Sequence, residues 1–424
     1  MPTAPDVETR ARRADALAFL NATGPITLPA GVSADAWAAR LETLGAPLHP
    51  WLSHRLAALG MERDIPEGIR DRLRASQQAS VVAELRRRSA LVEIADAFRA
   101  SRLPFVLLKG MALAHTHYPA PQLRTMSDID IWIQPDRFAD AGAILGRTGW
   151  QVPARYATHV RAATDALLLA RPETPFVLEV HSWPPSLGRD ASASERIWAR
   201  CDRVTIAGRE VCVCSTRDLV VHLCLHLTRK HGCSDGLRGL VDLACVARRI
   251  PDDATWRTLG AWHHDDGVAL WTTFALAMAR DLVGAPVPPS YFAAAGAPPV
   301  PETLRSLALE QLWDHEPTTM RGVEGMLAGE LGGPLHALRN YVRDFYAAPG
   351  ADGRRWWRAL PSRLRFDLTV RIPRYWRALR GGELRRGRLA RRATMIRDRH
   401  ALVDGLEELA RGLSEWPPAP SAPR

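Results

Sequence analysis

Residues 107–133 read LLKGMALAHTHYPAPQLRTMSDIDIWI and hold the densest group of chemically informative side chains in the protein. An apolar run ends at Lys109 and Gly110, and two aspartates, Asp128 and Asp130, follow among isoleucines. A short apolar run closed by glycine is typical of a core strand, and the alternation in SDIDIWI predicts a second strand. Two carboxylates on an otherwise apolar strand need a partner of opposite charge.

The two aspartates are predicted to share one face of their strand, because side chains alternate between faces. The three isoleucines then enter the core from the other face. With the two residues about 7 Å apart along the strand, both carboxylates can reach one cation. Without a cation they repel each other, so Asp128→Asn and Asp130→Asn are expected to abolish turnover and leave stability unchanged or raised. A hard divalent ion such as Mg²⁺ (or Mn²⁺), which prefers oxygen ligands, removes the repulsion.

A third carboxylate lies in FVLEVHSW, residues 176–183, where Glu179 alternates with apolar residues. This segment is predicted to be one of two strands around the turn RPETP. If it neighbours the acidic strand, the metal ligands become Asp128, Asp130 and Glu179, and such a site can hold two ions about 3.5–4 Å apart for displacement at phosphorus. His181 faces the same way as Glu179, and either orients substrate, moves a proton, or is an ordinary structural histidine.

The residues before the acidic strand are suited to phosphate. Gly110 lies where a strand passes into a helix, so backbone N–H groups can approach a phosphate closely. Lys109 and Arg124 can neutralise its charge, and Ser127, next to Asp128, is grouped with them as a nucleotide-binding residue. The ordinary alternative places the Asp-x-Asp pair and Glu179 on a solvated strand face. The order of glycine, loop, acidic strand and acid-bearing strand favours phosphoryl or nucleotidyl transfer.

This region resembles the DNA polymerase β-type nucleotidyltransferase superfamily, and within it a bacterial branch of uncharacterised nucleotidyltransferases. The resemblance covers about residues 100 to 185. The residues that carry it are Lys109-Gly110, Tyr118-Pro119, Arg124, Asp128-Ile129-Asp130 and Glu179 to Trp183.

The resemblance implies an α+β fold, with a small mixed sheet flanked by helices. It also implies that Asp128 and Asp130 bind metal and that Glu179 completes the site or activates the acceptor. Many members carry serine or glycine after the glycine, and this chain has Met111 there. That departure shifts the expected phosphate contacts onto Lys109 and the backbone.

The expected activity is transfer of a nucleoside monophosphate from a nucleoside triphosphate such as ATP to an acceptor, with release of pyrophosphate. A small hydroxyl compound, a peptide natural product or RNA remain open as acceptors. Members of the branch are often encoded near natural-product or polysaccharide biosynthesis genes. The alternative is a non-catalytic binding protein whose arginine-rich helices hold a partner.

Four regions are expected along the chain. Residues 1–100 are predicted to be helical, 101–215 to form the catalytic core, 216–330 to form a helical domain that completes the cleft, and 331–424 to be arginine-rich helices with a disordered tail. A segment rich in proline and glycine, 284–301, is expected to link helical regions.

Neither a run of about 20 apolar residues nor a secretion signal is found, which favours the cytoplasm.

All six cysteines lie between residues 201 and 245, among several histidines. Zinc is the alternative considered, but the common Cys-x-x-Cys spacing is missing and cysteines in an alternating strand pack as small apolar residues. Cys212, Cys214, Cys224 and Cys233 are therefore expected to carry no zinc. His222 and His226, on one helix face, are predicted to line the acceptor side.

The net charge is +10, and eighteen arginines lie between Arg339 and Arg399. Such a run can bind a polyanion, so a nucleic-acid acceptor is possible. Of the 56 basic residues, however, only Lys109 and Lys230 are lysines, so the arginine bias runs through the whole chain. A solvated helical face is the favoured interpretation of the run, since isolated surface charges contribute about 0–1 kcal/mol each.

Overall fold

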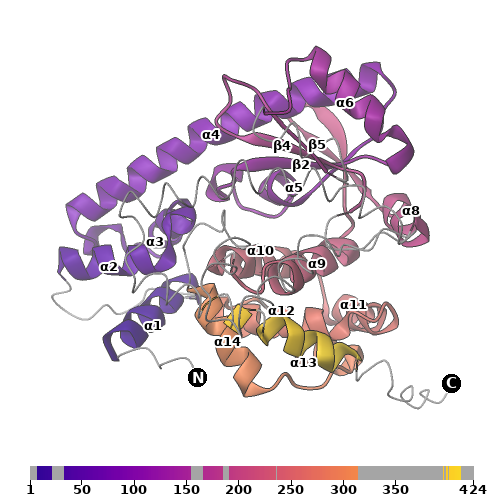
Figure 1. Ribbon diagram of the computed structural model, residues 1–424. Helices are drawn as coiled ribbons and strands as arrows, with labels where there is room; N and C mark the ends of the chain where they lie inside the picture. Colours follow the sequence, from indigo (N-terminus) through magenta and orange to yellow (C-terminus); the bar gives the residue numbers. More distant parts are fainter. Residues whose placement is uncertain are drawn as a thin grey trace, which may run out of the picture. The chain divides into compact units, whose positions relative to one another are not determined.

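The computed structural model describes residues 7–21, 33–153, 166–184, 191–234, 236–313, 395, 398–399 and 401–411 (Figure 1). These residues fall in two units. The first holds the described residues up to His222 together with Met395, and the second holds those from Leu223 to 313 and from 398 to 411. Almost all of the arginine-rich run and the C-terminal tail lie outside the described residues, so their predictions stay predictions.

The chain begins with helices, as the apolar spacing predicts. They are α1 (Val7–Asn21), α2 (Ala34–Leu44), α3 (His49–Ala58) and α4 (Glu67–Ala100), with 3-10 turns at Ala46–Leu48 and Glu62–Asp64. Ser33 caps α2, because its hydroxyl accepts a hydrogen bond from the N–H of Ala36 at 3.2 Å. In the second half of α4, apolar residues at three- and four-residue spacing are buried, which makes it the backing helix of the sheet.

Six strands form one mixed sheet in the described part of the first unit. They are β1 (Val106–Leu107), β2 (Asp128–Trp132), β3 (Ala166–Ala170), β4 (Val177–His181), β5 (Asp202–Ile206) and β6 (Arg209–Val213), in the order β3-β4-β2-β1-β6-β5. The pairs β1–β2, β3–β4 and β5–β6 are antiparallel, whereas β2–β4 and β1–β6 are parallel. The predicted α+β class and the mixed sheet are confirmed.

Short helices connect the strands. They are α5 (Lys109–Thr116), η3 (Pro121–Leu123), η4 (Pro135–Arg137), α6 (Phe138–Arg147) and α8 (Ala191–Ala199). The β5–β6 hairpin turns at Ala207 and Gly208, whose φ angles are 49° and 73°. Two positive φ angles in a two-residue loop match the right-handed twist of the strands, and glycine adopts one of them without steric cost.

The core of the first unit lies on one face of the sheet. Ile129, Ile131 and Ile133 are fully buried there. They join one hydrophobic cluster with residues of α4 and α6, which lie on the same face of the sheet (Figure 1). The opposite face of β2 therefore carries the two aspartates, as the period of two predicts.

The second unit is helical. It contains the end of α9 (Thr216–Leu225), a π-helical turn at His226–Lys230, α10 (Leu237–Ala247), α11 (Asp253–Asp265), α12 (Ala269–Val283), α13 (Pro289–Ala295) and α14 (Glu302–Leu312). The segment 284–301 is not only a linker, because it holds α13. A Cβ on Gly260 would lie 2.5 Å from the carbonyl oxygen of Tyr291, so glycine lets α11 and α13 pack closely.

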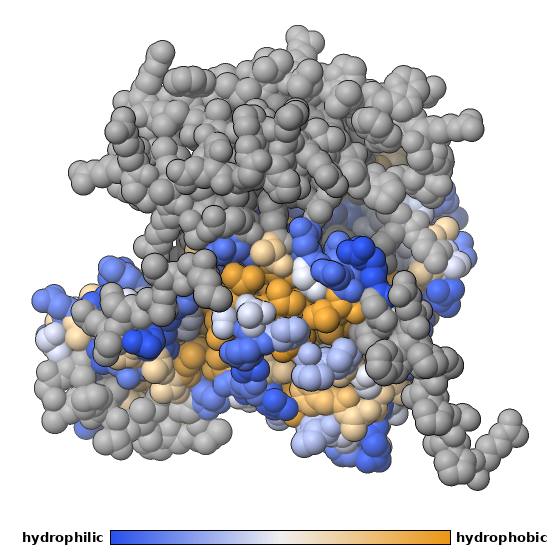
Figure 2. Space-filling view, turned by 60° about the horizontal axis from the view of Figure 1, so that its bottom comes forward, coloured by the Kyte–Doolittle hydropathy of each residue, from blue (hydrophilic) through white to orange (hydrophobic). Residues whose placement is uncertain are grey.

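The described surface mixes polar and apolar residues. On the face shown in Figure 2, hydrophobic residues gather in one area that hydrophilic residues border. Among the described residues, the large hydrophobic side chains classed as exposed are Val81, Val82, Leu85 and Trp262. None of the described helices is both long and apolar enough to cross a membrane.

Candidate functional site

The register of two parallel strands builds the centre of the candidate site. Asp130 of β2 lies opposite Glu179 of β4, and Trp132 lies opposite His181. Residues two apart on a strand share a face, so Asp130, Glu179 and His181 project to the same side. The structure thus brings Glu179 beside the acidic strand.

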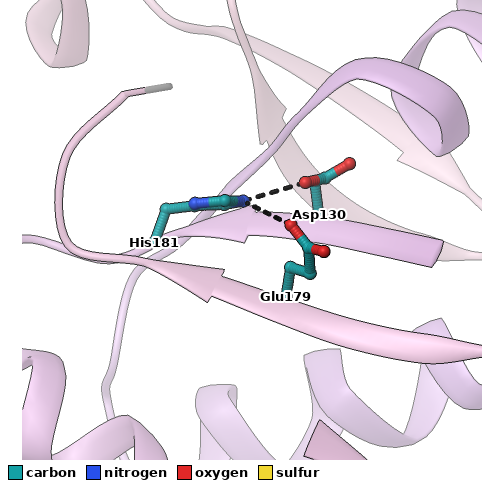
Figure 3. A group of neighbouring side chains, drawn as sticks. All are labelled: Asp130, Glu179 and His181. Carbon is teal, nitrogen blue, oxygen red and sulfur yellow. Dashed lines mark hydrogen bonds and ion pairs between the residues drawn. The ribbon is translucent and has the colours of Figure 1, made fainter. Parts of the chain in front are cut away.

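The three side chains converge in Figure 3, where the His181 ring points toward both carboxylates. Its Nε2 lies 2.8 Å from Oδ1 of Asp130 and 3.6 Å from Oε2 of Glu179. One donor atom from each residue lies within 4.8 Å of the other two. Asp130 is 3% exposed and the Glu179 side chain 30%, so the group is buried on one side and open on the other. Two carboxylates and an imidazole are a donor set that fits Mn²⁺ or, through the oxygens, Mg²⁺.

Asp128 has a different setting. It is the first residue of β2, lies opposite Val177 and is only partly buried. It shares a face with Asp130, but it is not one of the three residues whose donor atoms lie together in the described part of the chain. His181 takes the place that the sequence assigns to Asp128 in this close group.

Lys109 forms an ion pair with the group. Its Nζ lies 3.0 Å from Oδ1 of Asp130, and its side chain is 12% exposed. Backbone pairing sets this contact, because the N–H of Leu108 donates to the carbonyl oxygen of Asp130 at 2.9 Å. Lys109 has a φ of 39°, a left-handed conformation that costs a non-glycine residue about 1–2 kcal/mol. Such strain is held in place by its surroundings and is concentrated at functional sites.

The charges of this group support one another. Burial by itself would raise the pKa of Asp130, but the charge of Lys109 and the hydrogen bond from His181 hold it well below its usual range. Burial would likewise lower the pKa of Lys109, but Asp130 and Glu179 raise it above its ordinary value. Asp130 is therefore a carboxylate and Lys109 an ammonium at neutral pH, inside a largely buried site.

Gly110 and Arg124 meet at the first turn of α5. A Cβ on Gly110 would lie 2.7 Å from Nη1 of Arg124 and 3.0 Å from Sδ of Met126, so a larger residue would displace the ends of these two side chains. Arg124 is buried. Ser127 is exposed, and its carbonyl oxygen accepts a hydrogen bond from the N–H of Val177 at 3.3 Å. Two cationic side chains thus lie near the N-terminus of α5, where free backbone N–H groups also attract anions.

The other predicted residues are not members of this close group. His222 is fully buried in α9, in the first unit. His226 belongs to the second unit, where its Nε2 lies 3.2 Å from Nε2 of His231. No disulfide joins the cysteines, all of which lie in the described part of the chain. Burial raises the pKa of the Cys224 thiol far above its ordinary value, as expected for a packed rather than a reactive cysteine.

Sequence reasoning missed a polar group on α4. Ser80, Glu84 and Arg87 are buried, and they are spaced four and three residues apart on the helix face that also buries Leu91. That spacing is the signal that could have found them, because three polar residues continue an otherwise apolar stripe. Arg87 donates from Nη1 to the carbonyl oxygen of Met126 at 2.9 Å, two residues before Asp128.

His115, on α5, predicts an acid-sensitive fold. Burial and the charge of Arg88 lower its pKa from 6.5 to about 4, so the folded protein holds it neutral, 3.4 Å from Oε1 of Glu84. The unfolded chain takes up a proton below about pH 6.5, whereas the folded protein does so only near pH 4. The free energy of unfolding is therefore highest above pH 6.5 and falls by about 2–3 kcal/mol as the pH drops toward 4. Urea unfolding at several pH values between 6.5 and 4 measures this loss for the parent and for His115→Gln. The free energy of unfolding should depend less steeply on pH in the variant. An equally steep dependence in both proteins would contradict this prediction.

Comparison with known proteins agrees with the resemblance. The model of the family described as "Uncharacterised nucleotidyltransferase" matches residues 45–284, which is more than half of the chain. No curated protein matches significantly. One solved structure, the solution structure of the antibiotic-resistance factor ANT(2'')-Ia, is 14% identical, with a TM-score of 0.33 over 44% of this chain and 96% of that chain. The family match decides the assignment: this chain belongs to the uncharacterised nucleotidyltransferase family.

Proposed function

We propose that this nucleotidyltransferase moves a nucleoside monophosphate from a nucleoside triphosphate to a hydroxyl group, with the help of Mg²⁺ or Mn²⁺. The observation that carries the proposal is the convergence of Asp130, Glu179 and His181 beside Lys109, with Asp128 on the same strand face. Asp130 is buried and stays ionised beside Lys109 and His181. Carboxylates grouped with one imidazole are ligands that a divalent cation can accept.

The proposed reaction is a displacement at the α-phosphorus. The acceptor oxygen forms the new bond to phosphorus, the bond to the bridging α–β oxygen breaks, and pyrophosphate leaves with that electron pair. The acceptor proton passes to Glu179 or, through it, to water. A bound divalent cation would supply charge neutralisation at the phosphate oxygens and at the attacking oxygen.

The residues divide into three proposed roles. Asp128, Asp130 and Glu179 would hold the cation, and His181, whose Nε2 lies 2.8 Å from Asp130, would orient the carboxylates or serve as a further ligand. The triphosphate group is assigned to residues around the α5 N-terminus: Lys109, Gly110, Arg124 and Ser127. On the acceptor side His222 and His226 remain candidates.

For the acceptor we propose a small hydroxyl compound or a peptide natural product, in a natural-product or polysaccharide pathway of the cytoplasm. The residues that favour RNA, the arginines from Arg339 to Arg399, lie almost entirely outside the described part of the chain. The proposal therefore rests on the compact site and leaves RNA as a test outcome.

The deciding experiment uses each nucleoside triphosphate labelled at the α-phosphate. The protein is incubated with Mg²⁺ or Mn²⁺ and with pools of small hydroxyl compounds, peptides or RNA, and both pyrophosphate and transferred label are measured. Metal-dependent pyrophosphate release that the Asp128→Asn variant lacks is the expected result. Triphosphate binding without any release, in every pool and with either metal, would instead favour a non-catalytic binding protein.

Glu179→Gln should reduce kcat by at least about 100-fold, since a base or second metal ligand acts mainly in the transition state. Binding of the triphosphate should survive, because Glu179 is not among the residues assigned to the triphosphate. Single-turnover kinetics at saturating triphosphate, with calorimetric binding of a non-hydrolysable analogue, measure the two effects separately. An unchanged kcat would remove Glu179 from the catalytic group.

A further inference from the structure

Helix α4 holds the loop that leads into the candidate site. The hydroxyl of Ser80 donates to the carbonyl oxygen of Gln122 at 2.6 Å, and Nη1 of Arg87 donates to that of Met126 at 2.9 Å. This loop joins α5 to β2 and contains Arg124. Two side chains of one helix thus hold the loop backbone at two points.

Arg87 is an unusual anchor, because its guanidinium is charged and the residue is 3% exposed. A guanidinium has five N–H donors, and among the described residues Arg87 donates one hydrogen bond, to the carbonyl oxygen of Met126. Burial lowers the pKa of Arg87, while the charges of Glu84 and Asp128 raise it and that of Arg124 lowers it. Glu84, whose charge raises this pKa most, is itself buried three residues earlier on the same helix.

The anchored carbonyl lies between the two halves of the site. Met126 is two residues after Arg124 and two residues before Asp128, and its Sδ packs at Gly110. Any backbone shift at Met126 therefore moves the phosphate-side arginine and the first acid of β2 together. A misplacement of about 1 Å in such a group can reduce a rate about 100-fold.

We infer that Arg87 is a positioning residue, which fixes Asp128 and Arg124 through the backbone of Met126. This inference rests on the proposed function. Under this inference a residue of α4, which belongs neither to the sheet nor to the sequence motif, controls the geometry of the proposed cation site.

The test compares Arg87→Met with Arg86→Met, a matched control on the exposed face of the same helix. Arg87→Lys, which keeps the charge, is the conservative variant. For each protein, kcat, the KM for triphosphate, Mn²⁺ binding by electron paramagnetic resonance, and thermal unfolding are measured. We expect Arg87→Met to lower kcat about 100-fold and weaken Mn²⁺ binding about tenfold. Arg87→Lys should recover part of both losses, and Arg86→Met should match the parent.

Three results would overturn the inference. If Arg87→Met lowers only the melting temperature, and folded enzyme has normal kcat and Mn²⁺ binding, the residue is merely structural. If only the KM for triphosphate rises, Arg87 contacts the substrate directly. If Arg87→Met equals Arg86→Met in every measurement, Arg87 has no role.

Failure of the proposed function gives a different pattern. A parent protein that turns over no triphosphate refutes nucleotidyl transfer. Mn²⁺ binding still decides the inference in that case, because the comparison of Arg87→Met with Arg86→Met needs no turnover. Weaker Mn²⁺ binding in Arg87→Met alone supports the positioning role, and equal binding removes it.

Discussion

Substituting Asp130 with asparagine is expected to lower the free energy of unfolding of the metal-free protein by about 3 kcal/mol and to abolish turnover. Asp130 is 3% exposed and contacts two partners, Nζ of Lys109 at 3.0 Å and Nε2 of His181 at 2.8 Å. Asparagine keeps the shape but removes the negative charge, so a buried ammonium loses its counter-charge. This expectation reverses the one from sequence alone, in which relief of repulsion between Asp128 and Asp130 leaves stability unchanged or raises it.

Asp128→Asn is the matched control. Asp128 lies on the same strand face but is only partly buried, so its loss should abolish turnover with little change in stability. Urea unfolding of both variants in the presence of a chelator measures the difference. Equal unfolding free energies for the two variants would mean that the contacts of Lys109 and His181 with Asp130 do not stabilise the fold.

The sequence predicted the framework of the sheet because its signals are local. Alternation along SDIDIWI placed the isoleucines in the core and the aspartates on the opposite face. Proline and glycine in residues 284–301 indicated a break, but not α13, since a helix of seven residues has too little periodic pattern to detect.

The partners within the site were harder to predict, because they depend on strand order. Glu179 was chosen as an inward acid on a nearby strand, and the parallel pairing of β4 with β2 places it opposite Asp130. The same pairing brings His181 to Asp130, a contact that spacing along one strand cannot show. The sequence alone therefore predicts repulsion between the two aspartates, whereas in the structure the ammonium of Lys109 is paired with Asp130.

Arg87 shows a second limit of sequence reasoning. It stands in the run Arg86-Arg87-Arg88, which by composition is an ordinary solvated stretch of helix. Burial separates it from Arg86, which is exposed on the same helix. In a chain with many arginines, residue type alone does not show which arginine is buried. Arg87 is distinguished by its position on α4, four residues before Leu91 on the buried face of the helix.

Lys109→Met is expected to make the protein depend on metal for its stability. In the metal-free protein the ammonium of Lys109 lies 3.0 Å from Oδ1 of Asp130, and its side chain is itself largely buried. Methionine fills similar space without charge, so unfolding free energy without metal should fall by about 2–3 kcal/mol. Turnover should fall by about 100-fold or more, because the charge proposed to stabilise the departing phosphate is lost.

Added Mn²⁺ then separates two roles of Lys109. If Lys109 and the metal both bind Asp130, saturating Mn²⁺ should raise the free energy of unfolding more in Lys109→Met than in the parent. In the variant Mn²⁺ supplies the positive charge that is missing, whereas in the parent it must first displace the ammonium of Lys109. Lys230→Met, which replaces the other lysine of the chain at an exposed position, should gain as the parent gains. Unfolding with and without Mn²⁺ measures these gains. A gain in Lys109→Met no larger than in Lys230→Met would show that Lys109 does not compete with the metal for Asp130, and would limit its role to the triphosphate.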